Sequence, residues 1–250
     1  MQGLQDIGSR MPSDGTQRKE QGKSKTMVAQ HHLIREECVA DLEYVDVSGR
    51  LYSKVKRVLD FILALVGLSI ALIPMLVISV VIFLDDPGDV IFSQYRVGRN
   101  GKKFKLLKFR SMKKSAPKYM ATADLEDPQR HCTRVGRILR KLSLDELPQL
   151  LNVLVGDMSL IGPRPLIADE EEMHTMRTRF GVYTTRPGIT GLAQINGRDL
   201  VTAEEKIRWD AQYLKNFGFK ADVKILLTTV PKVLAREGVT GDRKKQDEAK

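Results

Sequence analysis

The chain has 250 residues, a length that accommodates one larger domain or two small ones. It carries 41 Lys and Arg against 31 Asp and Glu, a formal net charge of +10, which suggests a polyanionic partner such as nucleic acid, anionic lipid or phosphorylated substrates. The two cysteines, Cys38 and Cys132, and the four histidines lack the spacing of a zinc site or of a disulfide framework.

The two ends of the chain are polar. Residues 1–50 include the stretch SDGTQRKEQGKSK, which has too few apolar side chains to fold on its own. We therefore expect a disordered N-terminal tail, and it has no apolar core of the kind that marks a signal peptide. Residues 242–250 predict a second polar tail.

A long apolar segment follows the N-terminal tail. Residues 61–84, FILALVGLSIALIPMLVISVVIFL, contain no charge, and about 20 apolar residues suffice to cross a bilayer as a helix. Pro74 removes a helix hydrogen bond in the middle, and basic residues flank both ends. The positive-inside rule favours both flanks in the cytoplasm, which a re-entrant hairpin satisfies. A kinked helix that spans the membrane is the alternative. Asp60 is expected one helical turn from Lys56.

The next segment predicts two short strands. VIFSQYRVG and KKFKLLKFRSM flank the turn GRNGKK, and Asn100-Gly101 is a strong hairpin signal. Lys105 and Lys108 would lie on a positively charged surface. Basic residues interleave with aromatic ones here, so nucleic-acid binding is a rival interpretation.

The stretch RHCTRVGRILRKL predicts a cationic helix. Arg130, Arg134, Arg137 and Lys141 recur at helical spacing, and Arg140 lies beside that row. The basic row is compatible with two interpretations: an ordinary solvated helix face, and a face that contacts lipid headgroups or phosphates.

The region KIRWDAQYLKNFGFKADVKILLTTVPKVLAREG is predicted to be mostly helical. Its apolar stripe consists of Val223, Leu226, Leu227, Val230, Val233 and Leu234. The aromatic residues just before it, from Trp209 to Phe219, are typical of the membrane–water interface. An interfacial helix and a core helix of the domain are equally compatible with this pattern.

The stretch GPRP holds Arg164 between two prolines, which restrict the backbone on both sides. An arginine held so stiffly suits bidentate binding of phosphate oxygens. An exposed arginine in an ordinary rigid loop is the alternative.

The stretch RKLSLDELPQL sets two carboxylates, Asp145 and Glu146, directly after a basic run. Ser143 and Glu146 match a capping box, whereas Asp145 as N-cap would place Pro148 in the tolerated first turn. Either assignment predicts a helix N-terminus at the pair. Beside phosphate-binding cations, a carboxylate can instead hold Mg²⁺, abstract a proton or attack phosphorus.

Several long motifs in order make the chain resemble the bacterial sugar transferases, also called polyprenyl-phosphate hexose-1-phosphate transferases or monotopic phosphoglycosyl transferases. It is similar to the minimal form, which has a single membrane hairpin. The resemblance covers residues 54–241 and rests on KRVLD, the Pro-broken membrane segment, QYRVGRNGKKFKLLKFRSM, LSLDELPQLLNVLVGDMSLIGPRP, RPGITGLAQINGR and DVKILLTTV. The family commonly breaks its membrane helix at Ser-Pro, whereas Ile73 precedes Pro74 here.

The resemblance implies a monotopic enzyme on the cytoplasmic face of the bacterial inner membrane, in contact with membrane phospholipid. Such an enzyme transfers a sugar 1-phosphate from a UDP-sugar to undecaprenyl phosphate and releases UMP, as the first membrane step of surface polysaccharide or glycoconjugate biosynthesis. The resemblance also implies Mg²⁺ as cofactor.

The resemblance assigns roles to the residues singled out above. Asp145 is the implied nucleophile, holding a covalent phospho-sugar, and Glu146 the implied helper that binds Mg²⁺ or assists proton transfer. Both are candidate metal ligands. Lys108, Arg140 and Arg164 match family positions that contact phosphate, and RPGITG is expected to shape the nucleotide site.

We therefore expect a mostly α protein with a few short strands (α+β). A re-entrant helix-break-helix over 51–84, broken at Pro74, would anchor a cytoplasmic catalytic domain over 85–241 that carries interfacial amphipathic helices. Nucleic acid is not expected as a partner, and a homo-oligomer is left open. The rivals are a membrane-tethered nucleic-acid-binding regulator and a non-catalytic scaffold; the intact Asp145 and Glu146 argue against the scaffold.

Overall fold

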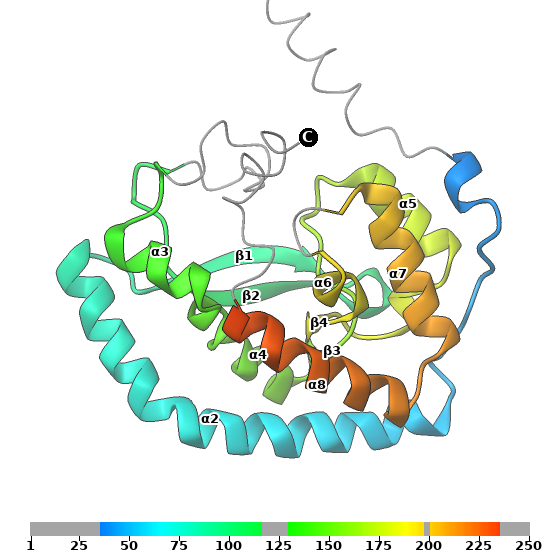
Figure 1. Cartoon of the computed structure of the whole chain (residues 1–250), viewed down its shortest axis with the longest axis horizontal. Helices are drawn as coiled ribbons and strands as arrows, with labels where there is room; N and C mark the ends of the chain where they lie inside the picture. The colour runs from blue at the N-terminus through cyan, green and yellow to red at the C-terminus, as the bar shows by residue number, and fades with distance from the viewer. Residues whose placement is uncertain (1–35, 117–129, 198–200, 236–250) are drawn as a thin grey trace, which may run out of the picture.

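The computed structural model describes residues 36–116, 130–197 and 201–235. Within these ranges helices predominate, and four short strands pair into two separate two-stranded sheets (Figure 1). This confirms the predicted α+β class. The elements in chain order are η1 (Glu36–Val39), α2 (Leu51–Asp85), β1 (Ile91–Val97), η2 (Arg99–Gly101), β2 (Lys103–Phe109), α3 (Arg134–Lys141), η4 (Leu144–Glu146), α4 (Gln149–Val155), β3 (Ser159–Ile161), α5 (Glu171–Arg179), η5 (Val182–Thr184), β4 (Gly188–Thr190), α6 (Leu192–Ile195), α7 (Ala203–Lys215) and α8 (Phe219–Ala235).

Helix α2 contains the predicted membrane segment. It is long and apolar enough to cross a membrane, by length and composition alone, and most of its large apolar side chains are exposed. The helix follows the lower edge of the body in Figure 1 and then bends upward. Helix α2 continues through Pro74, so the predicted break at that residue is wrong. A proline removes one hydrogen bond and opens the helix locally, while the bonds on either side maintain it.

Both ends of α2 are attached to the same folded body. Near its start, Arg57 donates hydrogen bonds to the carbonyl oxygens of Val153 and Leu154, at 2.5 and 2.8 Å. At its end, a carboxylate oxygen of Asp85 accepts a hydrogen bond from the backbone N–H of Val135, at 3.0 Å. The start and the end of the helix are thus held against one body.

The predicted hairpin is confirmed. Strands β1 and β2 pair antiparallel along their whole length, from Ile91 opposite Phe109 to Val97 opposite Lys103. The turn places Asn100 at φ 57° and Gly101 at φ 72°, the left-handed conformation that Asn-Gly adopts readily.

The predicted cationic helix is confirmed as α3, which begins at Arg134. The side chain of Thr133 caps it by accepting a hydrogen bond from the N–H of Gly136, at 2.9 Å. Arg130 lies in a turn before the helix and so does not extend its row of cations.

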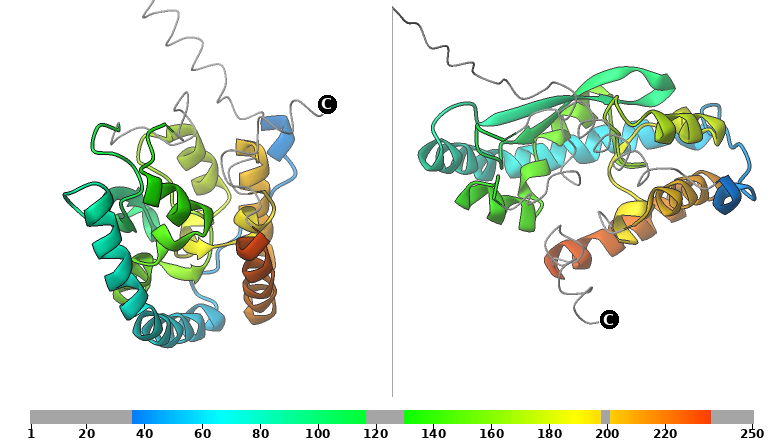
Figure 2. Two further views of the ribbon diagram at one scale, coloured as in Figure 1. Left: turned by 60° about the vertical axis from the view of Figure 1, so that its left-hand side comes forward. Right: turned by 90° about the horizontal axis from the view of Figure 1, so that it is seen from above.

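The second sheet pairs β3 and β4 in parallel and contacts α8, while β3 also contacts α4. The views in Figure 2 show the β1–β2 hairpin and α8 on different sides of the body.

The predicted helical region near the C-terminus forms two helices, α7 and α8. The aromatic residues before the stripe do not all face an interface, because Tyr213 and Phe217 are buried in the core and only Phe219 is largely exposed. The stripe itself is exposed at Leu227 and Val230. Helix α8 is therefore anchored at its start and exposes apolar side chains in its middle turns.

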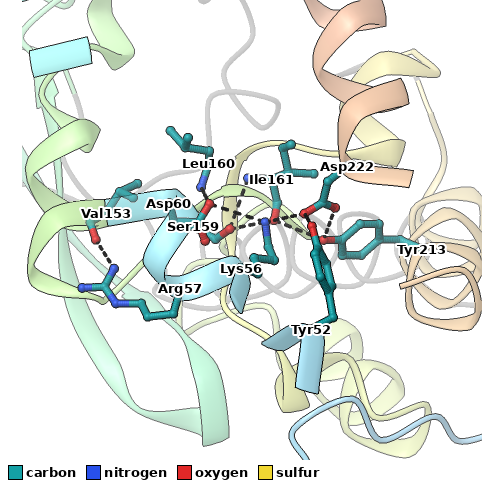
Figure 3. Close-up of polar contacts among 10 residues, drawn as sticks. All are labelled: Tyr52, Lys56, Arg57, Asp60, Val153, Ser159, Leu160, Ile161, Tyr213 and Asp222. Atoms are coloured by element: carbon teal, nitrogen blue, oxygen red, sulfur yellow. Dashed lines mark hydrogen bonds and ion pairs between the residues drawn. The ribbon is translucent and has the colours of Figure 1, made fainter. Parts of the chain in front are cut away.

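A buried polar cluster joins α2 to α7 and α8 (Figure 3). Asp222 accepts hydrogen bonds from the hydroxyls of Tyr52 and Tyr213, each at 2.8 Å. Lys56 Nζ lies 2.7 Å from Asp222 and 3.5 Å from Asp60, one helical turn away as predicted. The charges are almost fully removed from solvent, so each needs these partners to remain buried.

The described part of the predicted N-terminal tail is folded, which corrects the prediction for residues 36–50. Val39 and Val47 are fully buried and belong to two different apolar clusters of the core. The segment is polar on average, but it contains a few valines and leucines that fit surfaces formed by distant helices. Residues 1–35 and the predicted tail 242–250 lie outside the described residues.

Candidate active site

Asp145 and Glu146 lie in the short helix η4, which precedes α4. The backbone of Ser143 is left-handed, with φ 56°, and its side chain makes no capping hydrogen bond to η4. Helix α4 begins after Pro148, which is its N-cap. The predicted capping roles of Ser143 and Asp145 are therefore wrong, because the Ser143 side chain caps no N–H group of η4 and α4 begins only at Gln149.

The leucines on either side of the pair fix the turn. Leu144 and Leu147 pack against a cluster formed by Ile82 of α2, Phe109 of β2 and Leu139 of α3. Three elements, of which α2 and β2 are distant in the sequence, therefore hold the two carboxylates in place.

Two cations converge on Glu146. Lys108 Nζ lies 2.9 Å from Glu146 Oε1, and both guanidinium Nη atoms of Arg164 lie 3.4 Å from the same oxygen. The lysine and the glutamate are mostly buried, whereas the arginine side chain is 47% exposed. The structure thus brings Lys108, Glu146 and Arg164 together, as the sequence led us to expect, and leaves the arginine accessible to a ligand.

Asp145 differs from its neighbour in being buried. Burial raises the pKa of the Asp145 carboxyl above its usual 3.8, and the negative charge of Glu146 acts in the same direction. The positive charges of Lys108, Arg140 and Arg164 oppose this shift. The carboxylate is therefore more basic than an exposed aspartate, a property found at catalytic groups.

Arg140 does not join the ion pairs around Glu146. Its Nη1 instead contacts the sulfur of Cys132, at 3.9 Å, while its charge acts on Asp145. Arg140 therefore lies on the α3 side of the pair, and Lys108 and Arg164 approach Glu146 from β2 and from the loop after β3.

The side-chain amide of Asn152 determines where Lys108 lies. It accepts a hydrogen bond from the N–H of Leu107, at 3.0 Å, and donates one to the carbonyl of Lys105, at 2.7 Å. These bonds continue the ladder of β2 on its free edge and attach the strand to α4. Helix α4 follows the carboxylate pair directly, so the amide sets the distance between Lys108 and Glu146.

The backbone of Arg164 is held by a buried ion pair. Arg177 donates one hydrogen bond to the carbonyl oxygen of Arg164, at 2.7 Å, and another to Asp210, at 2.6 Å. Both charged side chains are almost fully buried. Arg164 is thus an exposed side chain on a rigid backbone, which suits a ligand-binding arginine.

The RPGITG stretch supports the same loop. Within it, the N–H of Gly188 donates to the carbonyl of Pro163, at 2.9 Å, and a Cβ on Gly188 would lie 2.1 Å from the backbone N of Gly162. Only glycine permits this close approach. The side chain of Arg186 donates to the carbonyl of Gly156, so it bonds to the end of α4. The expected role of this stretch in nucleotide binding stays a prediction.

Sequence reasoning missed several supporting residues. Asn152 is a buried amide in the otherwise apolar run LLNVLV, and that contrast was an available signal. Arg96 donates a hydrogen bond to the carbonyl oxygen of Pro165, at 3.3 Å. Burial, together with the charge of Arg164, lowers the pKa of Arg96 to about 10. Nothing in the sequence distinguishes the Arg177–Asp210 pair from ordinary surface charges on helices.

The predicted Mg²⁺ ligands are the carboxylates of Asp145 and Glu146. Within the described ranges, no three His, Cys, Asp or Glu side chains converge as a metal-ligand group. Asp145 and Glu146 fit a Mg²⁺ ion that takes one or two carboxylates and completes its shell with substrate phosphates and water.

Pro74, the predicted membrane-break residue, is exposed on α2 and is not part of this site.

The sequence profile described as bacterial sugar transferase matches residues 51–236, most of the chain. The chain belongs to the bacterial sugar transferase family. Membership makes this sugar transferase an enzyme of the phosphoglycosyl transferase class.

Three relatives illustrate the similarity. The sugar transferase is 42% identical over 184 residues to EpsL of Bacillus subtilis, an uncharacterized sugar transferase, covering 74% of this chain and 89% of that protein. It is 40% identical over 199 residues to the exopolysaccharide production protein ExoY of Sinorhizobium fredii, covering 73% and 87%. It is 38% identical over 197 residues to the undecaprenyl-phosphate galactose phosphotransferase of Salmonella typhimurium, covering 73% of this chain and 41% of that longer protein.

Proposed function

We propose that this enzyme transfers a sugar 1-phosphate from a UDP-sugar to undecaprenyl phosphate, as the first membrane step of surface polysaccharide or glycoconjugate biosynthesis. The observation that carries the proposal is the buried carboxylate of Asp145 beside the Lys108–Glu146–Arg164 ion cluster. Relatives named for undecaprenyl-phosphate phosphotransfer and for exopolysaccharide production support it.

The reaction divides into two displacements at one phosphorus atom. A carboxylate oxygen of Asp145 attacks the β-phosphorus of the donor, an Asp–O–P bond forms, and the bond to the bridging oxygen breaks, which releases UMP. A phosphate oxygen of undecaprenyl phosphate then attacks the same phosphorus, and the carboxylate leaves. The products are UMP and undecaprenyl diphosphate sugar, and Asp145 is regenerated.

The surrounding residues supply positive charge where negative charge accumulates. Without substrate, Lys108 and Arg164 neutralise the charge of Glu146. When donor phosphates bind beside Glu146, both side chains would contact them. Arg140 favours the ionised form of Asp145 from the other side. The raised pKa strengthens the carboxylate as a nucleophile once it is ionised.

Asp145 and Glu146 would hold Mg²⁺ jointly with the donor phosphates. Bound there, the ion supplies neutralisation of the phosphate charges and orientation of the leaving group. Glu146 would then exchange part of its pairing with Lys108 and Arg164 for the metal. Those two cations would become available to the substrate.

The attachment of α2 at both ends supports a monotopic placement on the cytoplasmic face of the inner membrane. Arg57 near the start and Asp85 at the end of the helix bond to one folded body, which cannot lie on both sides of a bilayer. The apolar outer surface of the bent helix would enter one leaflet and return, among membrane phospholipid. The exposed apolar side chains of α8 would lie in the interface beside it.

The decisive experiment replaces the proposed nucleophile. With UDP-sugars and undecaprenyl phosphate in detergent, Asp145→Asn should lower UMP release by about a thousandfold or more, because an amide cannot form the intermediate. Intact-mass spectrometry of the wild-type protein with donor alone should show an added sugar phosphate, which Asp145→Asn lacks.

Asp169→Asn is the matched control, because it makes the same change on an exposed aspartate. It should retain wild-type turnover and the mass increase. Near-normal turnover of Asp145→Asn, or a donor-dependent mass increase in that variant, would rule out Asp145 as the nucleophile.

A further inference from the structure

A cavity of about 490 Å³ opens beside α3, and the described residues that line it are Lys113, Arg130, Cys132, Arg134 and Arg137. Four of these five residues are cationic. The roles assigned so far to Lys108, Arg140 and Arg164 use none of them.

The walls of the cavity are held by backbone contacts. Met112 and Cys132 form an antiparallel bridge, and the N–H of Lys113 donates to the carbonyl of His131, at 2.8 Å. The first turn of α3 approaches the same segment so closely that a Cβ on Gly136 would lie 1.9 Å from the carbonyl oxygen of Ser111. The backbone that carries the cations is therefore fixed before any ligand binds.

The cations that line the cavity are exposed. Within the described part of the chain, Lys113, Arg134 and Arg137 form no salt bridge, and their side chains are exposed. Mutual repulsion among cations on adjacent walls is relieved when an anion binds between them. The cavity size is that of a site for a small ligand.

Arg140 connects this cavity to the reacting carboxylate. Its guanidinium contacts the sulfur of Cys132, a lining residue, and its charge acts on Asp145. Arg140 is therefore a neighbour of the cavity and also acts electrostatically on the proposed nucleophile.

The chemistry of the lining indicates which part of the substrates belongs here. The part of the lining that the structure describes carries four cations, Lys113, Arg130, Arg134 and Arg137, which suit a phosphate group. The leaving group of the proposed reaction is a nucleoside monophosphate, which is polar, carries two negative charges and gains charge as its bond breaks.

We propose that the cavity of Lys113, Arg130, Arg134 and Arg137 binds the nucleoside phosphate portion of the donor and retains it as the leaving group. The proposal rests on the proposed UDP-sugar reaction. Arg140 then separates two phosphate positions: the sugar-bearing phosphate beside Asp145 and the nucleotide phosphate in the cavity.

The test measures binding of UMP by titration calorimetry to the full chain in detergent. The double variant Arg134→Gln/Arg137→Gln should weaken UMP binding by about tenfold or more, because charge-assisted hydrogen bonds are lost. In turnover assays it should raise the KM for the UDP-sugar similarly and leave the KM for undecaprenyl phosphate within about twofold. Lys113→Gln, outside α3, gives an independent variant that should weaken UMP binding in the same direction.

Arg208→Gln is the control, since this arginine pairs with Asp41 on the exposed side of α7. It removes the same charge and should leave UMP affinity unchanged. Asp145→Asn should also keep wild-type UMP affinity, so binding to the cavity is measured independently of catalysis.

Unchanged UMP affinity in both the double variant and Lys113→Gln would overturn the inference. A rise in the KM for undecaprenyl phosphate alone would overturn it too, and would assign the cavity to the acceptor phosphate. If UMP binding is lost in the cavity variants while Asp145→Asn remains an active transferase, the cavity assignment stands and the proposed nucleophile fails.

Discussion

Asp145 and Glu146 are adjacent in the chain but occupy different surroundings. Asp145 is buried, and burial raises its pKa, whereas Glu146 is engaged by Lys108 and Arg164. Two neighbouring carboxylates with unlike environments commonly take unlike roles. This difference in environment supports Asp145 as the group that attacks phosphorus. It supports Glu146 as the group that pairs with the cations and holds the metal.

The pH dependence of the reaction should depend on Arg140. Its positive charge lowers the pKa of Asp145, against the stronger effect of burial, so its removal should raise that pKa further. Because the nucleophile must be ionised, the acid limb of kcat/KM should lie at higher pH in Arg140→Gln than in the wild type. A pH profile at fixed Mg²⁺ concentration measures this.

Lys141→Gln is the control for that profile, since it removes the next cation along α3, on an exposed side chain. Its acid limb should coincide with that of the wild type. An acid limb in Arg140→Gln that stays in place, or moves to lower pH, would contradict the electrostatic role of Arg140.

At the scale of elements, the site depends on how β2 is joined to α4. The strand brings Lys108, and the turn before the helix brings Glu146. Asn152 connects them through two hydrogen bonds to the backbone of β2. The amide therefore has a structural role with a direct effect on the geometry of the ion cluster.

Asn152→Ala should destabilise the protein and impair transfer. It leaves the part-buried N–H of Leu107 and the carbonyl of Lys105 without their partner, at a cost of about 1–3 kcal/mol in free energy of unfolding. Urea unfolding in detergent measures that loss. Asn216→Ala removes an exposed amide that bonds within its own helix terminus and should cost less than about 1 kcal/mol. Equal losses in the two variants would contradict this role of Asn152.

At the scale of the whole molecule, the cluster around Asp222 holds α2 and α8 together. Lys56 comes from α2 and Asp222 from α8, and both side chains are 7% exposed. Their partners Tyr52 and Tyr213 add two further hydrogen bonds (Figure 3). The relative position of the two apolar helices therefore depends on buried polar contacts.

Lys56→Met should lower the free energy of unfolding by about 3–5 kcal/mol, because it leaves buried carboxylates without their cation. Arg208→Met breaks an exposed ion pair with Asp41 and should cost about 0–1 kcal/mol. Thermal or urea unfolding of both variants in detergent measures the difference. A loss for Lys56→Met as small as that of the exposed pair would show that the cluster contributes little.

The one-sided placement of α2 can be tested with thiols. Cys38 is exposed before the helix, and Lys102→Cys in a Cys38→Ser background places a thiol in the hairpin turn beyond it. In intact cells both should be shielded from an impermeant maleimide and become reactive after lysis. Labelling of either one in intact cells would mean that the chain crosses the membrane.

The sequence by itself determined the features that depend on local chemistry. The uncharged run in α2, the Asn-Gly turn at Asn100 and the helical spacing of α3 were all predicted, because backbone preference and hydrophobic period act over a few residues. The long motifs also sufficed to indicate the family. Through the family resemblance, these motifs also identified Asp145 and Glu146 as the candidate catalytic residues.

Only the tertiary structure decided the environment of each group. It showed that Val39 and Val47 belong to the core, that Asp145 lies buried in a turn where capping was expected, and that the α3 cations line a cavity. Burial and charge pairing depend on side chains far apart in the sequence. For that reason the short stretch around Asp145 could not reveal them.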